Sequence, residues 1–220
     1  MKLSISSAAK QAGVCRALLL VIDGLKIGES TSDFVQRCQY QLNELPDLEQ
    51  YNLGMKSIIK KTTGKNKRTA GDSLRKNFKK NGFRPINNVV DAYNEASIYF
   101  GLGIGGHSLN SHDDQITIDL ANEFEQIKPL FKDEIVGIEK GQLIYRIGNK
   151  PMAWIGSKDV DSDDFKITNE TTKCMFVIFG HDHVSETEVH EVSDRIINNL
   201  SESTGIHTDA FQYSVSYVEA

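Results

Sequence analysis

The sequence has few cysteines, no long apolar run and no secretion signal. Its three cysteines, Cys15, Cys38 and Cys174, are an odd number without metal-ligand spacing, so we interpret them as reduced thiols rather than catalytic groups. The longest apolar run, residues 17–22, is far too short to cross a bilayer. The first residues lack the sustained apolar region of a signal peptide. We therefore expect a cytoplasmic protein that does not associate with membranes.

Common catalytic and nucleotide-binding signatures are also missing. The one Gly-rich segment, residues 101–106, follows an expected helix rather than a strand, which excludes a phosphate-binding loop, a dinucleotide fingerprint or a nucleophile elbow there. The densest histidine group, His181, His183 and His190, has no Cys or acidic partner at diagnostic spacing, so we expect a surface turn rather than zinc. We expect no cofactor and no metal.

Charge is distributed unevenly along the 220 residues, although the net charge is only −5. Basic residues dominate residues 60–84, where Asp72 is the only acid, and acids gather in the C-terminal half. Such polarity lets one face attract phosphates while the chain stays soluble, but a solvated helix face has the same pattern. The candidates for contact with an RNA backbone are Arg68, Arg75, Lys76, Lys79 and Lys80.

Apolar periodicity and turn residues predict helices first and strands later. Helices are expected over residues 5–11, 34–45, 47–61, 71–80, 86–100 and 185–200. Strands are expected over residues 14–22, 25–27, 116–120, 134–138, 143–147, 152–155, 174–179 and 211–218. Loops are expected over residues 62–69, 111–114 and 159–164. With no internal repeat and no long linker, this order predicts one compact α+β domain over residues 1–220, whose mixed, largely antiparallel sheet is flanked by helices.

Residues 86–110 hold most of the candidate site residues. Asn88, Asp91 and Glu95 lie three and four apart and share one face of the expected helix. The four glycines in residues 101–106 end that helix and permit positive φ and close approach to a ligand, directly before His107. We interpret the segment as the wall and rim of a pocket. A structural turn followed by a structural histidine is the alternative.

The same stretch resembles the B3/B4 domain, the editing module of the bacterial phenylalanyl-tRNA synthetase β subunit, which also occurs as a free-standing protein. The resemblance is carried by residues 86–94 (Ile-Asn-Asn-Val-Val-Asp-Ala-Tyr-Asn), Ser97 and residues 104–109 (Ile-Gly-Gly-His-Ser-Leu). Weaker flanking matches are residues 68–74, Trp154 and residues 166–168. The resemblance spans roughly residues 65–200, so residues 1–64 are expected to pack on the family-like core as an N-terminal segment.

The sequence departs from the synthetase-embedded domains at the histidine. Their editing histidine follows a Gly-x-Pro turn more closely, at the position of Gly105 here, and their proline is replaced by Gly103. His107 stands where those domains carry an aromatic residue. A catalytic role is therefore not transferred to His107 by position, and the Gly-Gly-His form resembles the free-standing members instead.

The resemblance implies an aminoacyl-tRNA deacylase that acts in trans on the ester of a mischarged tRNA. Such an ester is already activated, so positioning supplies most of the rate. In this hypothesis His107 and Asn94 orient water or substrate, and Asp91 or Glu95 recognises the ammonium group. The basic candidates would meet the acceptor stem of the tRNA, and no DNA partner is expected. The other candidates for substrate binding are Asn88, Ser97, Gly105, Gly106, Ser108, Trp154 and Thr168.

Two alternatives to a deacylase stay open. One is a non-catalytic RNA-binding module, and the other is a small-molecule hydrolase that uses the same pocket. The acidic net charge counts against both RNA hypotheses. The acidic segment over residues 159–164 is expected to be solvated surface, although Lys158 and Asp159 could contact a substrate amine or a phosphate.

Overall fold

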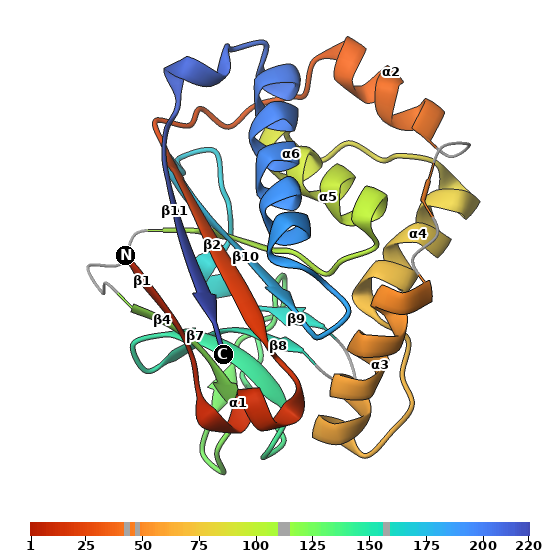
Figure 1. Ribbon diagram of the computed structural model, residues 1–220. Helices are drawn as coiled ribbons and strands as arrows, with labels where there is room; N and C mark the ends of the chain where they lie inside the picture. Colours follow the sequence, from red (N-terminus) through yellow and green to blue (C-terminus); the bar gives the residue numbers. More distant parts are fainter. Residues whose placement is uncertain (42–44, 47–48, 110–114, 156–158) are drawn as a thin grey trace.

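The computed structural model of the chain describes residues 1–41, 45–46, 49–109, 115–155 and 159–220. Within these residues it contains six α-helices and eleven strands (Figure 1). None of the described helices combines the length and the apolar character that a membrane span requires. The expected loop over residues 111–114 and the candidate contact at Lys158 lie outside the described residues.

The chain begins with strand β1 (Lys2–Ile5), helix α1 (Ser7–Ala12) and strand β2 (Arg16–Asp23). The side chain of Ser6 caps α1 by accepting a hydrogen bond from the Ala9 N–H, as its residue type predicts. A strand at residues 2–5 was not expected. The strand expected over residues 25–27 is absent, because β2 already has a partner strand on each of its two edges.

A four-stranded antiparallel sheet has the order β11-β2-β10-β3. Its members besides β2 are β3 (Gly105–Ser108), β10 (Lys173–Gly180) and β11 (Gln212–Glu219). The two inner strands, β2 and β10, are buried along nearly their whole length. Burial on both faces explains why each of them is a continuous apolar run in the sequence.

A five-stranded sheet has the order β1-β4-β7-β8-β9. Its other members are β4 (Gln115–Leu120), β7 (Leu143–Ile147), β8 (Lys150–Ile155) and β9 (Val160–Asp161). β1 pairs with β4 in parallel, and the remaining pairs are antiparallel. Two short strands, β5 (Gln126–Ile127) and β6 (Val136–Gly137), form a separate pair. The segment expected to be an acidic loop instead contains β9 and a 3-10 turn, Asp163–Phe165.

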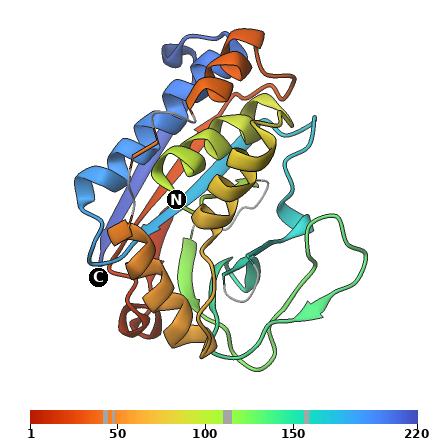
Figure 2. The ribbon, with the colours of Figure 1, turned by 90° about the vertical axis from the view of Figure 1, so that its right-hand side faces the viewer.

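The longer helices are α2 (Ser32–Tyr40), α3 (Glu49–Thr63), α4 (Ala70–Asn81), α5 (Asn88–Phe100) and α6 (Glu186–Thr204). α5 and α6 pack against each other, and α6 contacts both inner strands of the four-stranded sheet (Figure 1). α4 packs beside α5 in front of the same sheet (Figure 2). These positions confirm the predicted α+β class with mixed and largely antiparallel pairing.

One hydrophobic core joins β2, β10 and α6 to β4 and β7 of the other sheet. A smaller cluster of Phe34, Cys38, Phe78, Phe83 and Ile98 fills the space between α2, α4 and α5. Gly101 alone among the four glycines of residues 101–106 has a positive φ, of 63°, and it ends α5. Gly105 and Gly106 belong to β3, so the expected Gly-rich turn is half turn and half strand.

Candidate functional site

A cavity of about 680 Å³ lies between the start of α4, the middle of α5 and strands β7 to β9. α5 contributes Tyr93 and Asn94, β7 contributes Tyr145, and β8 contributes Trp154. Apolar side chains such as Ile155 cover much of the remaining wall. Apolar walls with a few converging polar groups are the usual construction of a small-molecule or cofactor pocket.

A buried tyrosine–histidine pair lies at the wall of this cavity, which Tyr145 lines directly. The Tyr145 hydroxyl lies 2.5 Å from Nε2 of His107, and each side chain is only 1% exposed. A Cβ atom on Gly105 would lie 1.6 Å from the Tyr145 hydroxyl, so the close approach of the two strands requires glycine at that position. Packing against Tyr145 therefore explains why residue 105 is a glycine, which its place in a Gly-rich run does not reveal.

His107 is neutral at physiological pH. Its burial lowers the pKa of the imidazole to about 3, because the charged form would lose its hydration. Burial also raises the pKa of the Tyr145 hydroxyl well above its usual value. Both groups therefore keep their uncharged forms, and the pair acts as a rigid hydrogen-bonded unit rather than as a charged acid or base.

Asp161 contributes a carboxylate to the cavity wall, as does its neighbour Asp159. Asp161 lies on β9 opposite Ala153, its Oδ1 is 3.9 Å from Nε2 of His107, and its side chain is 41% exposed towards the cavity. Burial among protein atoms, followed by the nearby charge of Asp159, raises the pKa of Asp161 to about 7. Perturbed acids in pockets often have functional roles. The sequence contains no spacing signal that would separate Asp161 from its acidic neighbours.

Trp154 forms a wall shared by two cavities. A second cavity, of about 960 Å³, lies between residues 129–137 and residues 159–161, and it also contacts Trp154. The indole N–H donates a hydrogen bond to Oε1 of Gln142, which fixes the ring plane. Asp159, Val160 and Asp161 line both cavities.

The lining of the first cavity also includes basic residues. Lys67 and Arg68 line it just before Thr69, whose side chain caps α4 by accepting from the Asp72 N–H. Lys76, Lys79 and Lys80 are exposed along α4. The positive end of a helix dipole adds to these charges at the start of α4.

Arg75 differs from the other basic candidates. Its guanidinium donates hydrogen bonds to the carbonyl oxygens of Ile98 and Tyr99 at the end of α5, and to that of Pro46. These bonds satisfy carbonyls that a helix terminus leaves without intrahelical partners. Arg75 therefore joins α4 to α5.

The polar face of α5 that holds Asn88 and Asp91 lies away from the cavity. The Asn88 side chain donates to the Lys26 carbonyl and accepts from the Gly28 N–H. The Asp91 carboxylate accepts from the Ser30 hydroxyl at 2.6 Å and from the Ile86 N–H at 2.7 Å. Both side chains thus hold neighbouring segments against α5.

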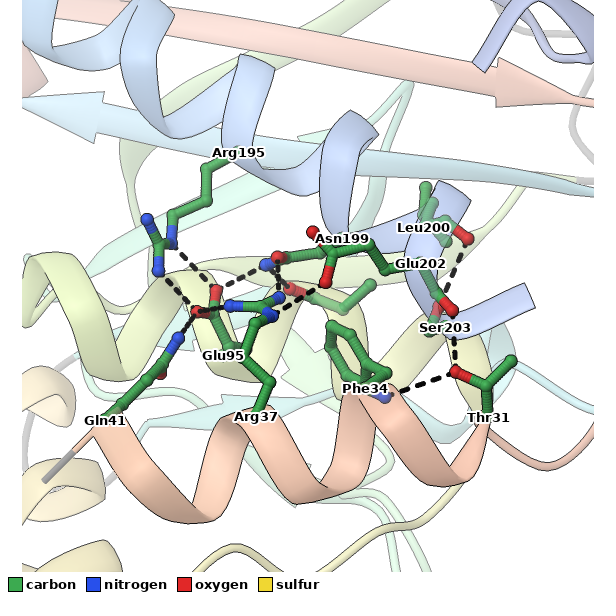
Figure 3. Close-up of polar contacts among 11 residues, drawn as sticks. Thr31, Phe34, Arg37, Gln41, Glu95, Arg195, Asn199, Leu200, Glu202 and Ser203 are labelled. Atoms are coloured by element: carbon green, nitrogen blue, oxygen red, sulfur yellow. Dashed lines mark hydrogen bonds and ion pairs between the residues drawn. The ribbon is translucent and has the colours of Figure 1, made fainter. Parts of the chain in front are cut away.

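Glu95 lies at the centre of a buried ion network between α2, α5 and α6 (Figure 3). The fully buried carboxylate pairs with Arg195 at 2.6 Å and with Arg37 at 3.0 Å, and the amides of Gln41 and Asn199 also donate to it. Burial alone would raise the pKa of Glu95, but the hydrogen bonds and charge of Arg195 and the two amides hold it below its usual value.

The remaining candidates are distributed around the site. Ser97 is buried in α5, Gly106 lies against the Tyr93 ring, and Ser108 accepts a hydrogen bond from the Thr171 hydroxyl. Thr168 is exposed and bonds to Glu170. The cavity therefore brings together five of the sequence candidates, with His107 behind Tyr145; the five are Arg68, Asn94, Gly105, Trp154 and Asp159. Sequence reasoning missed Tyr93, Tyr145 and Asp161.

The histidine group near the end of β10 is more buried than expected. His181 is 1% exposed, whereas His183 is exposed. Among the described residues, no three His, Cys, Asp or Glu side chains are grouped so that they could hold a metal ion.

Comparison with known proteins identifies the fold and the family. None of the curated proteins compared with this chain matches it. The fold is similar to that of an N-terminal fragment of the phenylalanyl-tRNA synthetase β subunit from Pyrococcus horikoshii, with a TM-score of 0.54 and 10% identity. The similarity covers 98% of this chain and 50% of the other, so this chain spans half the length of that structure. A family model described as the B3/4 domain matches residues 55–213, well over half of the sequence. The resemblance expected from residues 86–109 is therefore confirmed, and the chain belongs to the B3/4 domain family.

Proposed function

We propose that this protein is an aminoacyl-tRNA deacylase that acts in trans on a mischarged tRNA. The observation that carries the proposal is the mixed charge of the first cavity, whose lining includes both the basic Lys67 and Arg68 and the acidic Asp161. An aminoacyl ester at the end of a tRNA carries the complementary charges, a negative phosphate and a positive ammonium group joined through the ribose and the ester. Membership of the B3/4 family supports a tRNA-related role.

The reaction requires water to add to the ester carbonyl. The new bond joins the water oxygen to the carbonyl carbon, the bond to the ribose oxygen breaks, and the proton from water restores the ribose hydroxyl. In our proposal the Asn94 amide and the Tyr145 hydroxyl orient the water and the carbonyl oxygen, and neutral His107 holds the Tyr145 hydroxyl in position. Positioning of this kind suits an ester that is already activated.

The tRNA would lie across α4. The exposed side chains of Lys76, Lys79 and Lys80 would contact phosphates of the acceptor stem, together with Arg68 at the rim of the cavity. Arg75 contributes through the α4–α5 contact instead. Since charged tRNA is made where translation occurs, the proposal implies a cytoplasmic protein.

A panel of correctly and incorrectly charged tRNAs tests the activity. We expect selective release of one amino acid, and we expect Tyr145→Phe to slow that release roughly a hundredfold, the usual effect of removing one donor at a reacting oxygen. Tyr213→Phe is the matched control, because the Tyr213 side chain is 53% exposed on β11, outside the residues that line the cavity. Release that is equally fast in both variants would contradict the assigned role of Tyr145.

A non-catalytic tRNA-binding module is the second candidate function. It is favoured by the burial of His107, because the described residues that line the cavity include no histidine. Retention of tRNA with no release from any charged species would support this candidate over the deacylase.

A further inference from the structure

We propose that the Asp161 carboxylate binds the α-ammonium group of the substrate, so that the cavity accepts aminoacyl esters and rejects their N-acylated forms. This inference rests on the proposed function for the identity of the ester. The cation site itself can be tested without tRNA.

The position of Asp161 supports a role in recognition. β9 pairs with β8 so that Asp161 lies opposite Ala153, one residue before Trp154 on the same wall. The carboxylate is open to the cavity, whereas the adjacent His107 and Tyr145 are almost fully buried. Among the residues that the structure describes, no lysine or arginine forms an ion pair with Asp161. A ligand cation can therefore reach a carboxylate that is fixed by strand pairing.

The two acids expected to bind the ammonium are already committed elsewhere. Asp91 accepts hydrogen bonds from Ser30 and from the Ile86 backbone, and Glu95 pairs with two arginines. Neither side chain lines the cavity. In this proposal the ammonium is therefore recognised by Asp161 on β9 and not by an acid on α5.

The surroundings of Asp161 strengthen its preference for a cation. The charge of nearby Asp159 raises the pKa of Asp161. After burial, the charge of Asp161 in turn raises the pKa of the Tyr93 and Tyr145 hydroxyls. Uncharged His107 supplies no positive charge of its own. An incoming ammonium would relieve the repulsion between the two aspartates, and the half-buried Trp154 ring offers it a further favourable face.

An N-acyl group would remove this interaction in two ways. Acylation converts the ammonium to a neutral amide, and it adds bulk at the end of the cavity where the Tyr145–His107 pair is rigid. The carboxylate of Asp161 would then face a group that cannot neutralise it, which is unfavourable in a partly desolvated site. We therefore expect the cavity to accept aminoacyl esters and to reject N-acylaminoacyl and peptidyl esters.

Trp154 supplies a direct measurement, because it is the single tryptophan of the chain and lines both cavities. Its fluorescence is followed while phenylalaninol is added, which carries a charged amine, an apolar side chain and no carboxylate. N-acetylphenylalaninol is the matched neutral probe. We expect wild-type protein to bind the cationic probe at least about tenfold more tightly, which corresponds to one charge-assisted contact.

Variants then assign the effect to one carboxylate. Asp161→Asn should abolish the difference between the two probes, while Asp164→Asn should preserve it because Asp164 is exposed and does not line the cavity. Equal binding of both probes by wild type, no binding of phenylalaninol, or an unchanged preference in Asp161→Asn would each overturn the inference. The wild-type comparison keeps the test decisive even if a variant folds poorly.

Failure of the proposed function gives a different result. A cation preference that depends on Asp161, without release of any amino acid from tRNA, would support the cation site and contradict the deacylase. Equal hydrolysis of aminoacyl-tRNA and N-acetylaminoacyl-tRNA would support the deacylase and overturn the ammonium site.

Discussion

At the scale of single residues, the site depends on how closely two strands approach each other. Gly105 on β3 and Tyr145 on β7 come from different sheets, and the hydroxyl of Tyr145 occupies the space that a side chain at residue 105 would need. His107 completes the contact two residues further along β3. The Gly-Gly-His motif marks this place in the sequence, but nothing in the motif indicates that its partner is a tyrosine 38 residues further on.

Gly105→Ala should destabilise the protein by roughly 1–3 kcal/mol, because the new methyl group would displace the Tyr145 hydroxyl from His107. Urea denaturation measures the change in the free energy of unfolding. Gly137→Ala is the matched control, since its Cβ would meet no atom within 4 Å and its φ is not in the left-handed region. Equal stability of the two variants would contradict the close contact.

The buried imidazole of His107 should make stability depend on pH on the acidic side. Its folded pKa of about 3 lies below the ordinary value of 6.5, so the unfolded chain binds the proton first. The contribution of His107 to the free energy of unfolding should be fully present above pH 6.5. It should fall by up to about 1.4 kcal/mol for each pH unit below that value. His107→Gln should reduce this slope in denaturation curves between pH 4 and pH 7, and an unchanged slope would argue against an uncharged buried imidazole.

Asp161 should have the opposite pH dependence. Its folded pKa of about 7 lies above the ordinary 3.8, so the folded chain holds the proton longer and loses stability as pH rises from about 4 to 7. The shift alone would correspond to about 4 kcal/mol, but the side chain is 41% exposed, and solvent screening reduces our expectation to about 1 kcal/mol. Asp161→Asn should therefore be more stable than wild type at pH 8 and equal to it at pH 4, as measured by thermal unfolding.

At the scale of elements, α5 shows what periodicity can and cannot predict. Its apolar spacing is sufficient to predict the helix, which in the structure is capped by Asn87. Periodicity defines the faces of a helix but not the neighbour that each face meets. Arg37 and Arg195, which turn the Glu95 face inward, lie 58 and 100 residues away in the sequence. The strand β1 was missed for a related reason, since its four residues are ordered by parallel pairing with β4.

Glu95→Gln should cost roughly 3–5 kcal/mol of folding free energy, because it leaves the partly buried Arg195 without a balancing charge and leaves Arg37 with only the exposed Glu202. Glu202→Gln is the matched control. Glu202 also pairs with Arg37, but its side chain is 51% exposed, so its loss should cost less than about 1 kcal/mol. Chemical denaturation of both variants measures the contrast, and similar losses would show that burial does not govern the strength of this network.

At the scale of the whole molecule, basic and acidic side chains from distant parts of the sequence line one cavity. The net charge of −5 conceals this arrangement, because the basic residues before and along α4 are outnumbered elsewhere. The sequence located the basic segment correctly. It could not predict that Asp159 and Asp161, some 90 residues later, would line the same cavity as Arg68, since that meeting depends on how the five-stranded sheet packs against α4 and α5.

Affinity for tRNA should depend strongly on salt if α4 meets phosphates. Reversing Lys76, Lys79 and Lys80 to Glu should weaken binding and reduce the slope of log affinity against log salt by about 2 to 3, since each lost phosphate contact removes somewhat less than one unit. Reversal of Lys2, Lys10 and Lys150, which are exposed and do not line the cavity, changes the net charge by the same amount and is the control. Filter binding at several salt concentrations measures both, and an equal slope in wild type and the α4 variant would contradict an RNA contact on α4.

The pairing of β2 with β10 has a consequence for how the protein is made. Residue 23 at the end of β2 precedes residue 173 at the start of β10 by 150 residues, and β11 follows later still. At about 5–20 residues per second, the ribosome needs roughly 8 to 30 seconds to produce that interval. During this time the apolar strand β2 has neither of its partners, so the central sheet can close only after β11 has been made, up to residue 219. Until then residues 16–23 are exposed on the nascent chain and prone to aggregate, so we expect chaperones to protect them during synthesis.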